Sequence, residues 1–125
     1  MNALGRIHAA LVPGGLVLDA QPVSPRPQVE VGGERVGTLD LSEWGELITA
    51  VSDKVDLSIE AGHWEPVEER RYVVTDTFAR GDELIDTVAT WYGARVPRSL
   101  ERLLRAAPGA PEIHQDVRMR VLRAV

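Results

Sequence analysis

The segment that most constrains this fold is a short, almost continuous apolar run, Leu16–Ala20, broken only by Asp19. It follows Pro13, which ends a helical pattern, and the pair Gly14-Gly15, which supplies a tight turn. Such a run is typical of an interior strand covered on both faces, as the strands of parallel sheets are. The rest of the chain must therefore supply neighbouring strands and covering helices.

The remaining pattern alternates between helices and strands. A long central helix is the most strongly patterned element, because apolar residues recur along it at steps of three and four. Its predicted apolar stripe consists of Trp44, Leu47, Ile48, Val51, Val55 and Ile59. In chain order, we expect a helix over residues 2–12 capped by Asn2, the strand Leu16–Ala20, a loop at Ser24–Pro27, a hairpin over Val29–Val36 that turns at Gly32-Gly33, the long helix from Asp40 or Ser42 to Gly62, a strand over Val67–Phe78, a helix from Asp82 to Gly93, a helix from Pro97 to Pro108, and a last strand over Ile113–Leu122.

Periodicity also predicts which side chains share the core. Asp82 is expected to cap the third helix. Trp44 and Trp91 lie on apolar helix faces and are interpreted as core residues rather than as platforms for a ligand. Further apolar rows are Leu100, Leu103 and Leu104 in the fourth helix and Ile113, Gln115, Val117, Met119 and Val121 in the last strand, where they alternate with polar residues such as Arg118 and Arg120.

Composition narrows the class of protein. A chain of 125 residues predicts a single domain over residues 1–125, with an ordinary hydrophobic fraction of 44%. The net charge of −5 argues against a general nucleic-acid binder or a binder of anionic membranes. The absence of cysteine excludes disulfides and thiolate chemistry, and no apolar run is long enough to span a bilayer. A cytoplasmic protein is expected.

The order of elements, together with one motif, resembles a known family. Leu11–Leu18 is similar to the L-x-P-G-G-x-L segment that precedes the fifth strand of class I S-adenosylmethionine-dependent methyltransferases. Val36–Asp40 and the closing stretch Arg95–Arg123 are similar to bacterial small-molecule members of that family. The resemblance covers nearly the whole chain and corresponds to the C-terminal half of the family fold.

The resemblance implies an α/β or α+β fold with a small mixed sheet, flanking helices and an added hairpin. It places Ile113–Leu122 beside Leu16–Ala20, with Val67–Phe78 outside it. The family binds S-adenosylmethionine at a glycine-rich strand–turn–helix segment, and this sequence has no such segment. We therefore expect no cofactor bound to the chain alone, and S-adenosylmethionine only if the missing half is supplied.

This arrangement leaves Leu16–Ala20 with one neighbouring strand, and its other edge is a template for association. We therefore expect a homodimer, or docking on a cofactor-binding partner chain. The alternative is that Gln21–Val36 folds back and covers the edge.

Candidate site residues follow from the rule that ligands collect at the carboxyl ends of parallel strands. Asp19 and Asp76 are candidates for a general base, and Gln21 for substrate binding; the competing interpretation is that both carboxylates are simply exposed strand ends. No metal site is expected, because His8, His63 and His114 lack metal-ligand spacing. Arg98, Arg102 and Arg105, with Arg118, Arg120 and Arg123, could bind phosphate, although a solvated basic face is favoured.

The leading function is a non-catalytic or incomplete methyltransferase-like domain that self-associates or docks on a partner, and that could retain acceptor-substrate binding. One alternative is a methyltransferase completed by oligomerisation or by an N-terminal half. Another is a regulatory module that binds a small molecule. The sequence leaves open whether the protein is an enzyme.

Overall fold

The computed structural model describes residues 3–125, so the predicted cap Asn2 lies outside the described residues. Its elements confirm the predicted order of helices and strands. They are α1 (Ala3–Ala10), β1 (Leu16–Pro22), β2 (Gln28–Val31), β3 (Glu34–Thr38), α2 (Ser42–Glu60), β4 (Trp64–Thr77), α3 (Gly81–Val88), α4 (Arg98–Ala106) and β5 (Pro111–Ala124).

The sheet is organised around β5, and every pairing in it is antiparallel. One side of β5 pairs with β4 over nearly its whole length, and the other side pairs with β2 and then with β1. β3 pairs with β2. The predicted order is therefore confirmed: the last strand lies between the apolar strand β1 and the strand β4. Because both antiparallel neighbours oppose β5, β1 and β4 run in the same direction without touching.

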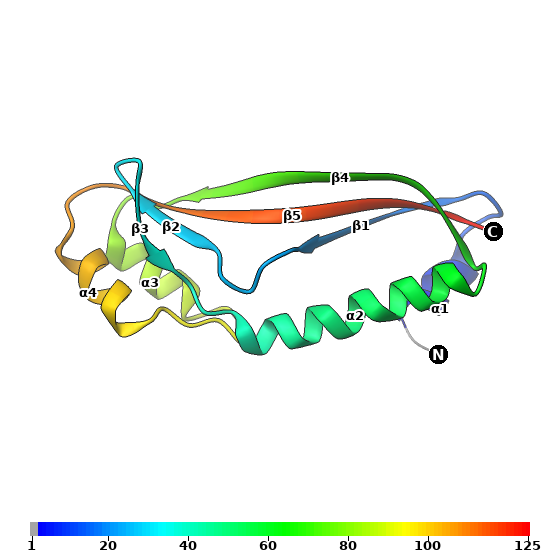
Figure 1. Cartoon of the computed structure of the whole chain (residues 1–125), viewed down its shortest axis with the longest axis horizontal. Helices are drawn as coiled ribbons and strands as arrows, with labels where there is room; N and C mark the ends of the chain where they lie inside the picture. The colour runs from blue at the N-terminus through cyan, green and yellow to red at the C-terminus, as the bar shows by residue number, and fades with distance from the viewer. Residues whose placement is uncertain (1–2) are drawn as a thin grey trace.

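The molecule has two layers, a sheet and a set of helices on one of its faces (Figure 1). α2 runs along the sheet, α3 and α4 cover the end that carries the hairpin, and α1 lies at the other end. No helix of residues 3–125 covers the opposite face of the sheet (Figure 1). The fold is a small α+β arrangement, as expected. The prediction of a mixed sheet is wrong, because every strand pairs antiparallel with its neighbours.

Buried apolar side chains form two separate clusters. The larger one joins β2, α3, α4 and the start of β5, and includes Val29, Leu84, Leu104 and Ile113. The smaller one lies under α1 and the end of α2, and consists of Val55, Trp64, Leu122 and Ala124, with partly buried side chains around it.

Tight turns form where the sequence predicts them. Gly32 and Gly33, with φ of 61° and 82°, make the turn of the β2–β3 hairpin, and Gly62, with φ of 81°, follows the end of α2. Glycine carries no penalty in this left-handed region, whereas other residues do. The hairpin and the end of the long helix are therefore confirmed.

Several side-chain predictions are wrong. Leu47 and Val51 of the predicted α2 stripe are exposed, as is Leu103 of α4. The helix α3 begins after Arg80 with no side-chain cap, and Asp82 instead forms an ion pair with Arg105. Periodicity identifies an apolar stripe correctly but does not tell how much of it the neighbouring layer covers.

The last strand also departs from simple alternation. Ile113 is odd-numbered and Leu122 is even-numbered, so in a flat strand their side chains would point to opposite faces of the sheet. Both are nevertheless fully buried, and all the helices of the described chain lie on one side (Figure 1). β5 must therefore twist along its length, as strands do in the right-handed sense. As a result Arg120, predicted on the polar row, points into the molecule with only 8% of its surface exposed.

Candidate functional site

The three predicted site residues fall into two groups. Gln21 donates a hydrogen bond from Nε2 to Oδ1 of Asp19, at 2.8 Å, so these two act together. Asp76 stands opposite Ile113 on β5, whereas Asp19 stands opposite Arg120. Seven residues of β5 separate these positions, roughly 24 Å at the rise of a strand. The structure therefore does not bring the two carboxylates into one site.

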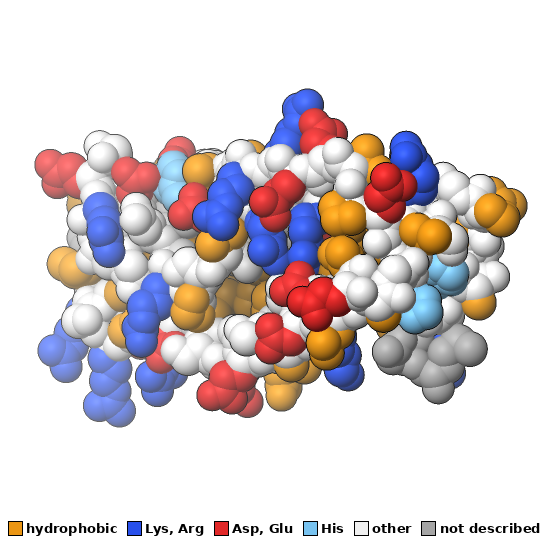
Figure 2. Space-filling model, turned by 45° about the vertical axis from the view of Figure 1, so that its right-hand side comes forward, with side chains coloured by type: hydrophobic (Ala, Val, Ile, Leu, Met, Phe, Trp, Pro, Cys, Tyr) orange, Lys and Arg blue, Asp and Glu red, His pale blue; other side chains and the backbone are white. Residues whose placement is uncertain are grey.

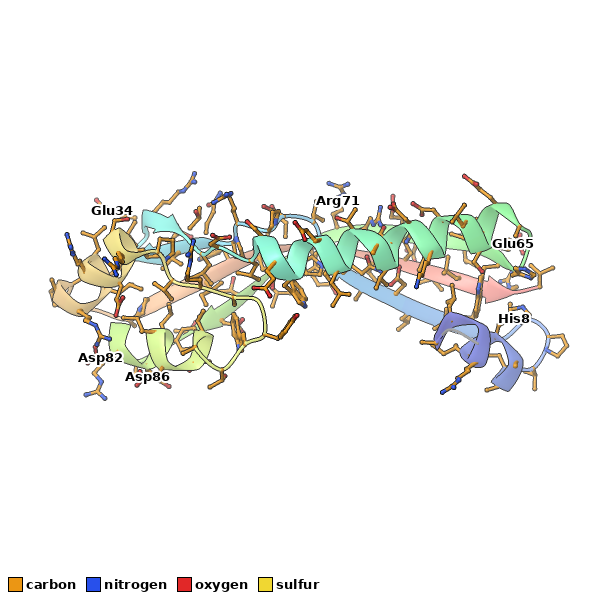
Figure 3. The ribbon with its side chains drawn as sticks, turned by 90° about the horizontal axis from the view of Figure 1, so that it is seen from below. His8, Glu34, Glu65, Arg71, Asp82 and Asp86 are labelled. Carbon is orange, nitrogen blue, oxygen red and sulfur yellow. The ribbon has the colours of Figure 1, made fainter. Side chains whose placement is uncertain are left out.

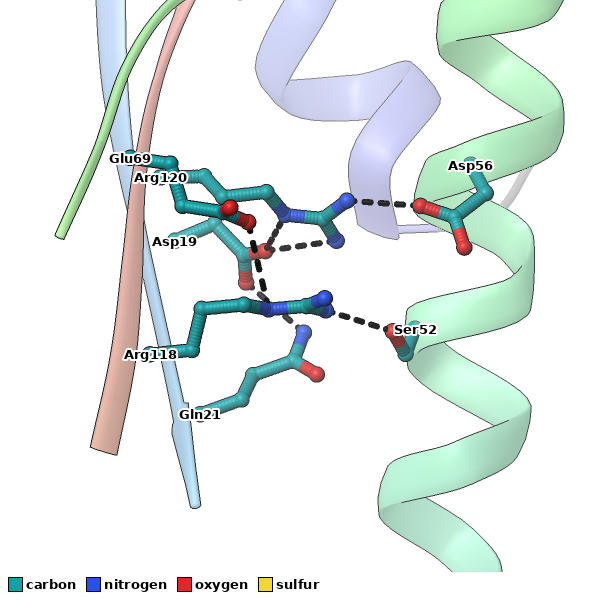
Figure 4. A network of polar contacts seen from close by, with 7 residues as sticks. All are labelled: Asp19, Gln21, Ser52, Asp56, Glu69, Arg118 and Arg120. Carbon is teal, nitrogen blue, oxygen red and sulfur yellow. Dashed lines mark hydrogen bonds and ion pairs between the residues drawn. The ribbon is translucent and has the colours of Figure 1, made fainter. Parts of the chain in front are cut away.

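Asp19 is the counterion of a buried arginine. Arg120 contacts Oδ2 of Asp19 through Nε at 3.2 Å and Nη2 at 3.1 Å, and its Nη1 donates to Oδ1 of Asp56 at 2.6 Å (Figure 4). Burial opposes the charged form, but the hydrogen bonds to Asp56 and Asp19 outweigh it, so the pKa of Arg120 is raised. A general base at Asp19 stays a prediction, and its carboxylate is already occupied.

A second arginine extends this network along the sheet. Arg118 donates from Nη2 to Oγ of Ser52 at 2.9 Å, and its Nε lies 3.8 Å from Oε1 of Glu69 (Figure 4). Arg71 stands directly opposite Arg118 in the β4–β5 pairing. The two arginines, with Gln21 and Ser52, line a groove of about 190 Å³ between the sheet and α2.

Sequence reasoning missed the helix side of this network, although a signal for it was present. Ser52 and Asp56 are four residues apart and therefore share one face of α2. That face meets Arg118 and Arg120, which are two residues apart and share one face of β5. Two polar residues four positions apart in a helix, and two charged residues two positions apart in a strand, indicate a row of polar contacts between that helix and the sheet.

The outer edge of β1 can be identified from its hydrogen bonds. Val23 N–H donates to Asp116 O at 2.9 Å, and Ala124 N–H donates to Gly15 O at 2.8 Å. Odd-numbered residues of β1 thus bond to β5, and the even-numbered ones direct their N–H and C=O groups away from it. Within the described chain, no strand pairs with that outer edge.

The single neighbour expected for β1 is confirmed, whereas the alternative that Gln21–Val36 covers its edge and the expectation of two covered faces are wrong. The segment 21–36 does not cover the edge, because β2 pairs with residues 111–114 of β5 instead. Nor are both faces of β1 covered, because Leu16 and Leu18 are 54% and 66% exposed. With no layer on one side, the even-numbered side chains of β1 face solvent, while Val17 and Asp19 face the helices.

The histidines serve local packing and pairing. His8 contacts Trp64 edge-on, with ring centroids 5.0 Å apart, and the ring of His63 lies 5.9 Å from that of His8. At the other end, Nε2 of His114 lies 2.6 Å from Glu30 and 2.9 Å from Glu112. Among residues 3–125, no group of three or more metal-type ligands comes together.

The predicted row of arginines does not form one surface. Arg105 is engaged by Asp82 and Glu101, each at 3.0 Å, and Arg120 is buried under α2. Over the middle of the face seen in Figure 2, acidic and basic side chains are interspersed. This distribution favours an ordinary charged surface over a phosphate-binding one.

Comparison with known proteins gives no relative: no family model matches the chain, and no curated protein or solved structure matches it significantly. No helix formed by residues 3–125 combines the length and the apolar character needed to cross a membrane.

Proposed function

We propose that this chain is a non-catalytic assembly domain of methyltransferase-like architecture that associates through the outer edge of β1. The observation that carries the proposal is the unpaired edge itself, seven residues long and flanked by exposed leucines. An edge of this kind presents a row of free N–H and C=O groups beside apolar side chains, and such an edge pairs readily with another strand.

The edge has little of the usual protection against association. Natural edge strands are blunted by charged side chains, especially lysine, by proline, by bulges or by charges that point inward. β1 has a proline only at its last position, Pro22, and the charge of its single ionisable residue, Asp19, is paired with Arg120. The other edge of the sheet is different, because β4 carries Glu65, Glu68 and Arg70 along an exposed strand. This difference in exposed charge favours association through β1 over association through β4.

The occupant that fits this edge best is a second copy of the chain. Two β1 strands related by a two-fold axis would pair antiparallel and join two sheets into one. The outward-facing row of N–H and C=O groups belongs to uncharged residues, among them Leu16, Leu18 and Ala20, and the carboxylate of Asp19 is already paired with Arg120. Pro22, which has no N–H to offer, ends the same row.

The methyltransferase part of the proposal is supported by the strand order. β1, β5 and β4 lie in the order that the family resemblance implies for its fifth, seventh and sixth strands. The 125 residues contain no glycine-rich strand–turn–helix segment for an adenosyl cofactor. We expect that titration of the purified chain with S-adenosylmethionine gives no calorimetric signal, whereas micromolar binding would favour an enzyme completed by oligomerisation.

Association is tested by sedimentation velocity over a range of protein concentrations. We expect a dimer for the native chain, and a dissociation constant raised about tenfold or more by Leu18→Lys, because the lysine places a charge at the new strand pair. Val73→Lys is the matched control on β4, where a similarly exposed apolar residue is changed, and it should leave the dimer intact.

Hydrogen exchange distinguishes edge pairing from other modes of association. In the dimer, the amides of Leu16, Leu18 and Ala20 should become protected, because they then donate to the second copy. A chain that remains monomeric at high concentration, or a dimer in which these amides exchange as fast as in the Leu18→Lys variant, would contradict the proposal. A dimer broken by Val73→Lys instead would move the interface to β4.

A further inference from the structure

Half of the aromatic side chains of this protein line a single pocket. The sequence has three tryptophans, two tyrosines and one phenylalanine, and Trp44, Trp91 and Tyr92 all border one cavity of about 380 Å³. The same cavity is bordered by Asp76 and Gln115 from the sheet. Its size lies in the range of small-molecule sites, which are apolar pockets with a few polar groups.

The pocket is assembled from three separate parts of the chain. Trp44 comes from the first turn of α2, Trp91 and Tyr92 from the turn after α3, and Asp76 from the end of β4. Gly93 makes this approach possible, because a Cβ at that position would lie 2.9 Å from the backbone nitrogen of Trp44. The turn that carries Trp91 and Tyr92 is therefore packed directly against the backbone of Trp44.

Packing accounts for only part of this arrangement. Trp44 and Trp91 are partly buried against the large apolar cluster, as the sequence predicts for core residues. Tyr92 is 73% exposed, so its ring does not serve the core. Tyr92 therefore adds an exposed aromatic side chain to a pocket that two half-buried indoles also border.

The charged residues around the pocket indicate the charge of the ligand that it would bind. Asp76 is exposed, and within residues 3–125 it forms no ion pair and no side-chain hydrogen bond. No arginine or lysine borders the cavity. An unneutralised carboxylate beside aromatic faces attracts a cation twice, through its own charge and through the ring quadrupoles.

We infer that the pocket between Trp44, Trp91, Tyr92 and Asp76 binds the alkylated ammonium group of a small organic molecule. Alkyl groups on the nitrogen suit the apolar walls and reduce the cost of removing the cation from water, which a primary ammonium pays in full. This inference is independent of association through β1, because the pocket lies beside the other part of the sheet.

The test uses choline as the probe and the full-length, isotope-labelled chain. The three indole N–H resonances are followed during titration, and those of Trp44 and Trp91 should shift and saturate, with a dissociation constant on the order of 1 mM for so open a site. Trp64 is an internal control, because it is buried in the small cluster at the other end. The neutral isostere 3,3-dimethylbutan-1-ol should bind about tenfold more weakly.

Two variants and one control complete the test. Asp76→Asn and Tyr92→Leu should each weaken choline binding about fivefold, and both change exposed residues, so the spectrum should remain that of the folded chain. Glu65→Gln removes the same charge from an exposed residue at the opposite end of the molecule, near His8 (Figure 3), and should leave binding unchanged.

Several outcomes would overturn the inference. They are equal binding of choline and its neutral isostere, a shift of Trp64 as large as that of Trp91, and no saturation up to about 100 mM, far above the expected affinity. Phosphatidylcholine vesicles carry the same ammonium group. Co-sedimentation with them would assign the pocket to a lipid headgroup rather than to a free molecule.

Discussion

The two ends of this molecule are built differently. At the α3–α4 end, ten buried apolar residues from α3, α4, β2, β5 and the segments that follow β3 and β4 form a continuous cluster. At the α1 end, the described residues supply a cluster of four, α1 contains no buried residue, and a polar network under α2 occupies the space that apolar side chains fill elsewhere. The open edge of β1 belongs to this second end.

The two ends differ in how much apolar surface they bury. A domain of this size needs a continuous core to be stable, and the α3–α4 end has one. The α1 end instead presents exposed leucines and an unpaired strand edge, the two features on which the proposed association rests. Substitutions at the two ends should therefore change the free energy of unfolding by different amounts.

The largest effect is expected in the core of the α3–α4 end. Leu84 is completely buried, so Leu84→Ala should lower the free energy of unfolding by about 3 kcal/mol, through lost transfer energy and the cavity left behind. Leu4→Ala on α1 removes the same atoms from a partly buried site and should cost about 1 kcal/mol. Urea unfolding of both variants measures the difference. Equal costs would show that the two ends are equally well packed.

The next effect concerns the polar network of the α1 end. Arg120→Ala leaves the largely buried Asp19 without its counterion, and we expect a loss of about 2 kcal/mol, less than for a fully buried pair because Asp56 is half exposed. Arg123→Ala is the control on the same strand; its contact with Glu65 is exposed and 3.7 Å long, so it should cost under about 0.5 kcal/mol. Chemical unfolding that finds the two variants alike would mean that the network does not hold β1 to α2.

The contrast between the ends also explains what could be predicted from the sequence. Turn glycines, apolar runs and helix periodicity are local signals, and they predicted the hairpin at Gly32-Gly33 and the end of α2 at Gly62. The placing of the last strand between β1 and β4 came instead from the family resemblance, because strand pairing is not a local property. Which side of a strand is covered depends on twist and on the layer above it. Arg120 therefore had the pattern of an outward residue, although the twist of β5 and the carboxylate of Asp56 bring it inside.

The candidate site shows the same limit. The position of Asp76 at the end of β4 followed from the strand order, but its aromatic neighbours could not be predicted, because they come from α2 and from the turn after α3. Nothing in local periodicity relates Trp44 to Trp91. Their approach depends on the conformation of Gly93, with φ of 68°, and hence on tertiary contacts.

The smallest effect is a dependence on pH at the α3–α4 end. Asp40 accepts hydrogen bonds from Oγ and N–H of Ser42, at 2.6 and 3.0 Å, and pairs with Arg95 at 3.0 Å. These contacts, those of Ser42 first, lower the pKa of Asp40 from 3.8 to about 2. Because the folded pKa is the lower one, its contribution to stability is present above pH 3.8 and is lost as the pH falls through about 2.

Asp40→Asn should therefore lower the free energy of unfolding at neutral pH by about 1 kcal/mol, a value reduced by solvent screening and by the hydrogen bond that an amide oxygen can still accept from Ser42. The difference from the native chain should shrink between pH 4 and pH 2, as the native carboxylate becomes protonated. The control is Asp53→Asn, which changes an exposed carboxylate within α2 and should alter the free energy of unfolding by less than about 0.5 kcal/mol. If the difference in free energy of unfolding between Asp40→Asn and the native chain stays constant across this pH range, the link between the start of α2 and the loop before α4 is not electrostatic. The stability of this end would then rest on its apolar cluster alone.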